Sequence, residues 1–322
     1  MIERVRAEGL LGPGRPVVVL YSGGCDSTCL LEVAVRVAGR DAVTALHVNY
    51  RLRAAAAADE DHCARLCARL GVPLEVRRPQ RPQDGNLQAW ARDVRYGAAA
   101  RIAAPRGADV AAGHTASDQV ETILYRLASS PSRRALLGMR RRDGALIRPL
   151  LLFTREQTGG YCSERDLSWR MDESNSAGVY ARNRLRAGLM PALREIHPAA
   201  EANVLALAEL LRDEAVVLDA AVDAVLDGRE RIALARLREL SPALRRLVVQ
   251  RLADGAAGGL APGAARRAEE VAALTEHGQT ALDLPHGVRA IAEQGVLRFG
   301  RTPQRRRDAP ATNRRASARP QK

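Results

Sequence analysis

The stretch 17–31, VVVLYSGGCDSTCLL, constrains this chain more than any other part of the sequence. Its apolar run from Val17 to Tyr21 is short and rich in β-branched residues, which is typical of a buried parallel strand. A glycine turn follows, and an apolar-periodic stretch after it predicts a helix. This arrangement favours phosphate binding, because glycine lets an anion approach closely and a helix start presents free N–H groups. We expect the phosphate-binding loop to be Ser22, Gly23, Gly24, Cys25, Asp26 and Ser27.

The loop differs from two common nucleotide-binding motifs. Walker A requires Gly-Lys-Ser/Thr and the dinucleotide fingerprint requires G-x-G-x-x-G, and neither is present. The only lysine of the chain is Lys322, which argues against Schiff-base chemistry and against a ligase that carries AMP on its own lysine. Asp26 is unfavourable in an anion site unless a divalent cation lies between it and the phosphates. Backbone, hydroxyl, arginine and metal must therefore hold the phosphate.

Strand and helix patterns alternate over the first half of the chain. Strands are expected at 17–21, 43–48, 74–77 and 109–112, with helices at 28–38, 55–70 and 86–104. This rhythm predicts an α/β fold with a doubly wound, mostly parallel sheet and ligands at the carboxyl ends of its strands. Beyond Pro149 the rhythm changes. We predict a catalytic domain at 1–198, a helical substrate-binding region at 199–276, a small β-rich element at 277–300 and a basic, disordered tail at 301–322.

The net charge of +13 is divided between the tail, 301–322, which carries +7, and the remaining +6. A basic body is compatible with a nucleic-acid substrate, and the tail is either a solvated extension or a non-specific RNA contact. Five scattered cysteines fit a reducing compartment, and Cys63 and Cys67 are expected to be buried small hydrophobes. The chain has no 18-residue apolar run and no apolar core of a signal peptide. We therefore expect a cytoplasmic protein without a membrane segment.

Further candidate residues follow the fourth strand and lie on the third helix. Asp118 is either a helix cap or a metal ligand opposite Asp26, with His114 placed to bind phosphate or assist proton transfer. Arg92 and Arg95 share a helix face, which is either a solvated stripe or an anion clamp. A later segment concentrates arginine and asparagine near tyrosine and tryptophan, which suits RNA contacts. Its candidate residues are Arg182, Asn183, Arg184 and Arg186.

Taken in order, these segments resemble the tRNA(Ile)-lysidine synthetase family of PP-loop, or N-type, ATP pyrophosphatases. The family motifs are SGGxDS, HxNHGLR, ARxxRY, GHxxDDQxETxLxRL, GLxGM, RPLL, WxxDxSNxxxxYxRNxxR and LxP. The match runs from about Val17 to Leu193 in the same order and with similar gaps. The rest of the chain matches only in layout, as a helical region followed by a small β element.

The resemblance implies an adenine nucleotide alpha-hydrolase-like fold and a ligase that uses ATP and Mg²⁺. Its implied substrates are free L-lysine and the isoleucine tRNA with a CAU anticodon, whose wobble cytidine is adenylated and then converted to lysidine with release of AMP and pyrophosphate. The implied roles are Ser22 to Ser27 for pyrophosphate, Asp26 and Asp118 for Mg²⁺, Arg92 and Arg95 for phosphate or the lysine carboxylate, and Arg182 to Arg186 for RNA. A homodimer is one option for the assembly.

Three departures from the family pattern affect the expected site. Tyr50 and Arg51 replace His-Gly in HxNHGLR, Ser117 replaces the first aspartate of the Asp-Asp pair, and residues 128–133 replace a glycine-containing turn. Two other functions remain open: a PP-loop tRNA 2-thiolation enzyme and a non-enzymatic basic RNA-binding protein. Thiolation chemistry requires paired cysteines, and no CxxC motif is present. A simple RNA-binding protein would leave SGGCDS and the second acidic position unexplained.

Overall fold

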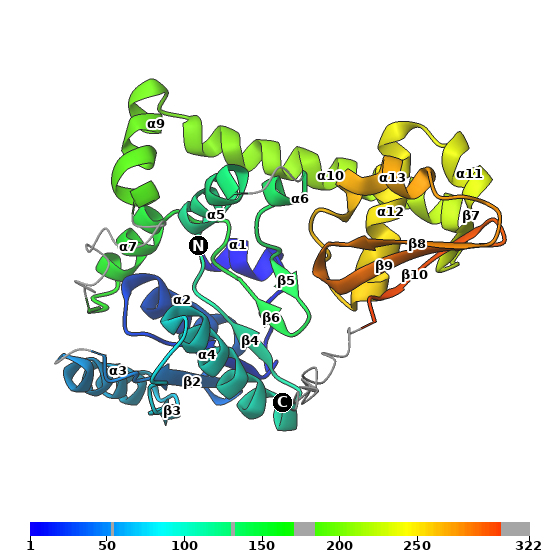
Figure 1. Ribbon diagram of the computed structural model, residues 1–322. Coiled ribbons are helices and arrows are strands. Elements are labelled where there is room, and N and C mark those ends of the chain that lie inside the picture. The colour runs from blue at the N-terminus through cyan, green and yellow to red at the C-terminus, as the bar shows by residue number, and fades with distance from the viewer. Residues whose placement is uncertain (53–54, 130–132, 171–183, 304–322) are drawn as a thin grey trace, which may run out of the picture. The chain divides into compact units, whose positions relative to one another are not determined.

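The computed structural model describes residues 1–52, 55–129, 133–170 and 184–303. The chain forms two compact units, Met1–Asp213 and Glu214–Lys322 (Figure 1). Among the described residues, no helix is both long enough and apolar enough to cross a membrane.

The first unit is built on a six-stranded sheet with the order β3-β2-β1-β4-β6-β5. Every neighbouring pair is parallel except β5 and β6, which form an antiparallel hairpin. The chain moves outward from β1 in one direction to β2 and β3, and in the other to β4. The strands are β1 (Val17–Leu20), β2 (Val43–Val48), β3 (Leu74–Arg77), β4 (Asp109–Ala111), β5 (Arg142–Asp143) and β6 (Leu146–Ile147).

Helices cover both faces of this sheet. The helices of this unit are α1 (Ile2–Ala7), α2 (Cys25–Ala38), α3 (Ala56–Leu70), α4 (Leu87–Ala103), α5 (Ala116–Ser129), α6 (Arg133–Leu136), α7 (Arg155–Glu164) and α9 (Met190–Ile196). Local signals explain several helix ends. The side chain of Asn86 accepts hydrogen bonds from the first turn of α4, and α7 begins with a reciprocal capping box between Thr154 and Gln157.

Alternate residues of β1 point into two different cores. Val17 and Val19 join a cluster with residues of α1, α2, α3 and α7, whereas Val18 and Leu20 pack against α4. All four residues are buried, as a central parallel strand requires. The result is a rigid strand that ends directly at the glycine turn.

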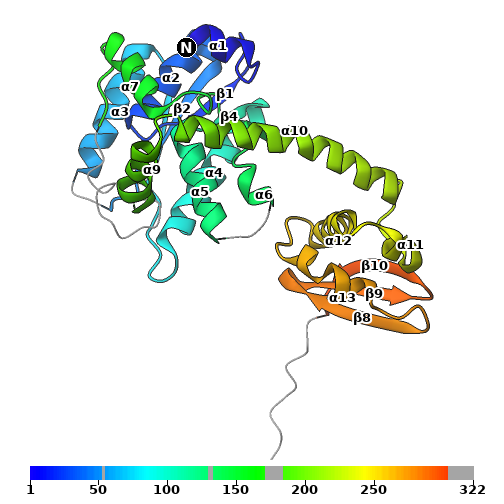
Figure 2. The same ribbon diagram turned by 90° about the horizontal axis from the view of Figure 1, so that it is seen from above.

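The second unit combines helices with a four-stranded antiparallel sheet of order β7-β10-β9-β8. Its apolar core includes residues of α12, which packs against β9 and β10 (Figure 2). The helix α10 (Ala200–Leu226) begins in the first unit and ends in the second. The other elements are β7 (Arg231–Ala233), α11 (Leu234–Glu239), α12 (Pro242–Ala257), α13 (Ala268–Ala272), β8 (Gln279–Leu284), β9 (Val288–Glu293) and β10 (Val296–Arg301).

The predicted fold class is confirmed. All four predicted strands of the first half are present, with ends that differ by at most one residue, and so are the three helices between them. Three strands were not predicted: the β5–β6 hairpin and β7, which lies inside the region expected to be helical. Strand β10 ends at Arg301, so that residue belongs to the sheet rather than to the tail. The functional division at 198/199 stays a prediction.

Candidate active site

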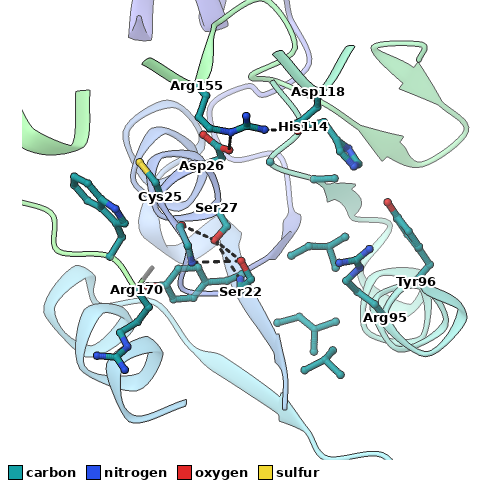
Figure 3. A pocket seen from close by; sticks show the side chains of 18 of the residues that line it. Ser22, Cys25, Asp26, Ser27, Arg95, Tyr96, His114, Asp118, Arg155 and Arg170 are labelled. Atoms are coloured by element: carbon teal, nitrogen blue, oxygen red, sulfur yellow. Dashed lines mark hydrogen bonds and ion pairs between the residues drawn. The ribbon is translucent and has the colours of Figure 1, made fainter. Parts of the chain in front are cut away.

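A cavity of about 670 Å³ opens at the carboxyl ends of β1 and β4 (Figure 3). This is the point where the strand order changes direction, which is where open α/β sheets bind ligands. The phosphate-binding loop forms one wall, and side chains from α4, α5 and α7 contribute to the others. The polar side chains that line the cavity are Ser22, Cys25, Asp26, Ser27, Tyr50, Arg95, Tyr96, His114, Asp118, Arg155, Arg170 and Arg186.

The loop residues are held by hydrogen bonds centred on Ser27. The Ser27 hydroxyl donates to the Gly24 carbonyl at 2.9 Å and accepts from the Ser22 N–H at 3.2 Å. Helix α2 starts at Cys25, so the N–H groups of its first turn face the cavity without partners inside the helix. Gly23 has φ +84, and a Cβ at this position would lie 3.0 Å from the Cys63 sulfur. Glycine is therefore required there by both conformation and space.

Two carboxylates that are far apart in the sequence meet at one guanidinium. Arg155, at the start of α7, places Nη2 2.7 Å from Asp118 Oδ1 and Nε 3.5 Å from Asp26 Oδ2. Asp26 also accepts a hydrogen bond from the Thr158 hydroxyl, one turn further along α7. The other oxygen of Asp118 accepts bonds from the N–H and hydroxyl of Thr115, both at 2.9 Å. Figure 3 shows the two aspartates on either side of the arginine.

A third carboxylate and a second arginine extend this network. Glu121 lies one turn after Asp118 on α5, is 3% exposed, and accepts from Arg186 at 2.8 and 2.9 Å. Arg186 is also 3.6 Å from Asp118, and Arg155 is 3.4 Å from Glu121. Arg186 belongs to a π-helical turn, Leu185–Leu189, before α9. We call Asp26, Asp118, Glu121, Arg155 and Arg186 the acid–arginine network.

The carboxylate of Asp26 lies in a site that favours a nearby cation. Burial raises the pKa of this carboxyl group and the Asp118 charge raises it further, whereas Thr158 and Arg155 lower it. Within the described residues, no three His, Cys, Asp or Glu side chains are grouped so as to hold a metal ion. Mg²⁺ commonly needs only one or two carboxylates together with phosphate oxygens and waters. Asp26 and Asp118, which already share one positive guanidinium, fit that requirement.

Comparisons with known proteins agree with this geometry. Residues 6–193 match the PP-loop domain family. The tRNA(Ile)-lysidine synthase of Symbiobacterium thermophilum is 37% identical over 94% of this chain and 69% of the relative. The chain belongs to the tRNA(Ile)-lysidine synthase family of PP-loop proteins. The protein of the same name from Thermus thermophilus is 36% identical over 89% of this chain and 57% of its own length.

The chain is thus shorter than these relatives and spans between 57% and 69% of their length. A solved structure with a related fold is the U34-tRNA thiolase of Methanococcus maripaludis with its 4Fe-4S cluster. It superposes with a TM-score of 0.54 at 15% identity and covers 66% of this chain and 77% of the thiolase. At that identity the likeness concerns the fold alone.

Two residues that depart from the family pattern, Ser117 and Tyr50, make defined contacts, whereas residues 130–132 of the third departure lie outside the described residues. The Ser117 hydroxyl accepts the backbone N–H of Arg155 at 3.1 Å, so the residue in place of an aspartate joins α5 to the start of α7. Tyr50 donates its hydroxyl to the Ala91 carbonyl of α4 at 2.8 Å and packs edge-on against Trp90. Both residues therefore help to position the wall of the cavity. Tyr50 also lines the cavity itself.

The structure brings most of the predicted site residues to one cavity. The loop residues except Gly23, together with Asp118, His114, Arg95 and Arg186, line it. Arg92 lies outside the lining and places its guanidinium 4.8 Å from the centre of the Tyr96 ring. Arg184 is exposed, and Arg182 and Asn183 lie outside the described residues. The chemical roles of all these residues stay predictions.

Sequence reasoning missed the support on the other side of the loop. The Arg170 N–H donates to the Gly23 carbonyl at 2.9 Å, and its side chain bonds Asp59 of α3 at 3.0 Å. Asp59 is only 5% exposed, which is unusual for an acidic residue unless it has a charged partner, and Arg170 is that partner. The Asp59–Arg170 pair therefore stabilises the glycine turn through the hydrogen bond to the Gly23 carbonyl. Glu121, Arg155 and Arg170 fall within or beside the matched motifs and Thr158 lies near them, but the sequence assigns none of the four a role, because they carry no spacing signal of their own.

Proposed function

We propose that this protein is an ATP-dependent ligase that joins free L-lysine to C2 of the wobble cytidine of the CAU-anticodon isoleucine tRNA. Membership of the tRNA(Ile)-lysidine synthase family supports this substrate pair. The observation that carries the proposal within the structure is the meeting of Asp26 and Asp118 at the end of the phosphate-binding loop, bridged by Arg155. A loop for pyrophosphate beside two carboxylates suits cleavage of ATP between its α and β phosphates.

The reaction has two steps. In the first, the cytidine O2 attacks the ATP α-phosphate, an O–P bond forms, and pyrophosphate leaves. In the second, the lysine ε-amine attacks C2, the C2–O bond breaks, and AMP leaves with the oxygen while the amine loses a proton. The carbonyl oxygen is a poor leaving group until it carries the adenylyl group. Positioning and charge stabilisation supply most of the acceleration in such reactions.

The residues of the phosphate-binding loop bind and orient the departing pyrophosphate. The first-turn N–H groups of α2 and the Ser22 hydroxyl donate to its oxygens, and the rigid bonds of Ser27 keep these donors in place. Asp26 and Asp118 would hold Mg²⁺, which would supply positive charge to the pyrophosphate. Arg155 pairs with the same two carboxylates.

Other polar residues are assigned to the remaining substrate groups. His114, on the segment after β4, binds phosphate or accepts the amine proton. Arg92 and Arg95 bind a phosphate or the lysine carboxylate. The RNA strand is assigned to Arg182, Asn183, Arg184 and Arg186, and Arg186 can serve it only by loosening its pair with Glu121.

The cysteines favour this reaction over tRNA thiolation. Sulfur transfer uses a thiolate. The pKa of the Cys25 thiol, which lines the cavity, is raised by its hydrogen bond with Cys162 and by burial. Burial also raises the pKa of Cys63 and Cys67 to about 12. These groups stay protonated at neutral pH and are poor nucleophiles.

Incubation of the purified chain with ATP, Mg²⁺, radiolabelled lysine and the isoleucine tRNA tests the proposal. Label should enter this tRNA together with one pyrophosphate per lysine, and a CAU methionine tRNA is the control because it has the same anticodon. Cleavage of ATP without lysine incorporation would refute the lysine ligase and leave another PP-loop reaction. Binding of tRNA without any ATP cleavage would identify a non-enzymatic RNA-binding protein.

A further inference from the structure

Two arginines lie over the ring of Tyr96 on the wall of the cavity, and a third is near. The guanidiniums of Arg92 and Arg95, both on α4, lie 4.8 and 5.4 Å from the centre of the tyrosine ring. The third, Arg148, follows β6, and the charges of Tyr96, Asp143 and Arg92 act on it. Figure 3 shows Arg95 and Tyr96 on α4, across the cavity from Asp26.

In the described part of the chain, these three arginines form no close ion pair, although the charge of Asp143 acts on Arg148. Within the described residues, Arg92, Arg95 and Arg148 form no ion pair within 4.0 Å, whereas the neighbouring Arg142 binds both oxygens of Asp109. Arg148 is only 6% exposed. A buried charge normally requires a counter-charge, because the loss of hydration costs several kcal/mol. Burial accordingly lowers the pKa of Arg148 from its usual value.

The same cluster holds buried hydrogen-bond donors that nothing in the described part of the chain accepts. They are Arg95 Nε, Arg148 Nε and the Tyr96 hydroxyl. Arg148 makes one side-chain bond, from Nη1 to the Arg140 carbonyl at 2.6 Å. An arginine Nε–H can only donate, so each such group needs an acceptor. A donor left unsatisfied costs about 1–3 kcal/mol. One oxyanion could satisfy both the charges and the donors.

We propose that Arg92, Arg95, Arg148 and the Tyr96 hydroxyl bind a phosphodiester of the RNA strand beside the target nucleotide. This inference rests on the proposed function, since it takes the substrate to be RNA. Arg92 is exposed and Arg95 is half-buried and lines the cavity, so positive charge runs from the surface to the cavity wall. Arg148 is buried and adds its charge from outside the lining.

The arrangement fits an RNA backbone better than an amino-acid carboxylate. A nucleotide whose base enters the cavity brings a phosphate on each side of its sugar, and a run of cations can follow them. A single carboxylate is satisfied by one arginine in a bidentate pair. Three guanidiniums that form no close ion pair with any described acid exceed that requirement.

The salt dependence of tRNA binding tests this site. Each phosphate contact contributes about 0.7 to the slope of log K against log salt for a single-stranded segment. We expect Arg148→Gln and Arg92→Gln each to reduce the slope by up to that amount, because the arginines share the phosphate, and to weaken binding severalfold at low salt, with the difference shrinking as salt rises. Arg101→Gln is the matched control, because Arg101 is an exposed arginine on the same helix.

Several outcomes would overturn the inference. Unchanged slopes in both variants, or an equal loss in Arg101→Gln, would show that the cluster binds no RNA phosphate. A raised KM for lysine, with an unchanged salt dependence of tRNA binding, would assign the cluster to the amino-acid carboxylate instead. Arg92→Gln keeps the test valid if the buried Arg148→Gln variant fails to fold. Failure of the wild-type chain to bind tRNA at all would instead contradict the proposed function.

Discussion

Gly113→Ala is expected to separate the two aspartates that carry the proposed chemistry. Gly113 follows β4 and lies directly against the first turn of α2. A Cβ built on it would be 3.2 Å from the backbone of Asp26 and from the Ser27 nitrogen. This close approach keeps the segment that leads to Asp118 beside Asp26. A methyl group there would push the strand end and the phosphate-binding loop apart.

The size of the effect follows from that distance. Nonpolar carbon contacts are most favourable at about 3.5–4.0 Å, so the new methyl group is several tenths of an ångström too close to backbone that cannot rotate away. Overpacking of this kind typically costs about 1–3 kcal/mol. For a unit of this size, each kcal/mol lowers the melting temperature by about 2–4 °C. We therefore expect a loss of about 4–8 °C for a cost near 2 kcal/mol.

Gly160→Ala is the matched control. Gly160 lies within α7, and a Cβ there would meet no atom within 4 Å. Alanine in a helix is favoured over glycine by about 0.5–1 kcal/mol, so this variant should melt at a slightly higher temperature. Thermal melts and pyrophosphate release measure the two effects. The reasoning is refuted if Gly113→Ala melts like the wild type and releases pyrophosphate at the same rate.

Further predictions follow from the same structure. Asp26→Asn should abolish pyrophosphate release in the tRNA-dependent assay but keep tRNA affinity, and its melting temperature at pH 7 should not fall, because burial already disfavours the carboxylate charge. Removal of residues 304–322 should weaken tRNA binding at low salt only, without loss of selectivity, as measured by titration at two salt concentrations. Burial lowers the pKa of His47 below its usual 6.5, so the folded state binds fewer protons than the unfolded chain, and the free energy of unfolding should fall as the pH drops below about 6.5. Urea titrations at pH 7.5 and 5.5 should show this loss, and His47→Asn should reduce it.

The sequence was most informative where its pattern is local and strong. The apolar run before Ser22 and the glycine turn after it identify a parallel strand and a phosphate-binding loop, because a buried central strand has few alternative explanations. The β5–β6 hairpin was missed since its strands have only two residues each. Strand β7 was missed for a different reason: its three residues, Arg231–Ala233, gain their structure from pairing with β10, more than sixty positions later.

The acid–arginine network shows why the site itself was only partly predictable. Asp26 and Asp118 could be placed at one edge of the sheet, because each follows a strand and parallel strands end at the same edge. Arg155 gave no such signal, since it follows the segment 148–154 after β6 and reaches the site only because Thr154 caps the start of α7 at that point.

The resting network also constrains how the site must work. Arg155 and Arg186 together offer two positive charges to three carboxylates, so the network retains one negative charge. Asp26 and Asp118 would hold a divalent cation, which would supply positive charge beside them. Arg155 binds both carboxylates, and its guanidinium can donate to a phosphate as negative charge develops on the leaving group. On this reasoning Arg155→Lys, which keeps the charge but loses the planar fork that spans two carboxylates, should slow pyrophosphate release more than it weakens ATP binding. A variant with unchanged turnover and a raised KM for ATP would instead confine Arg155 to ground-state binding.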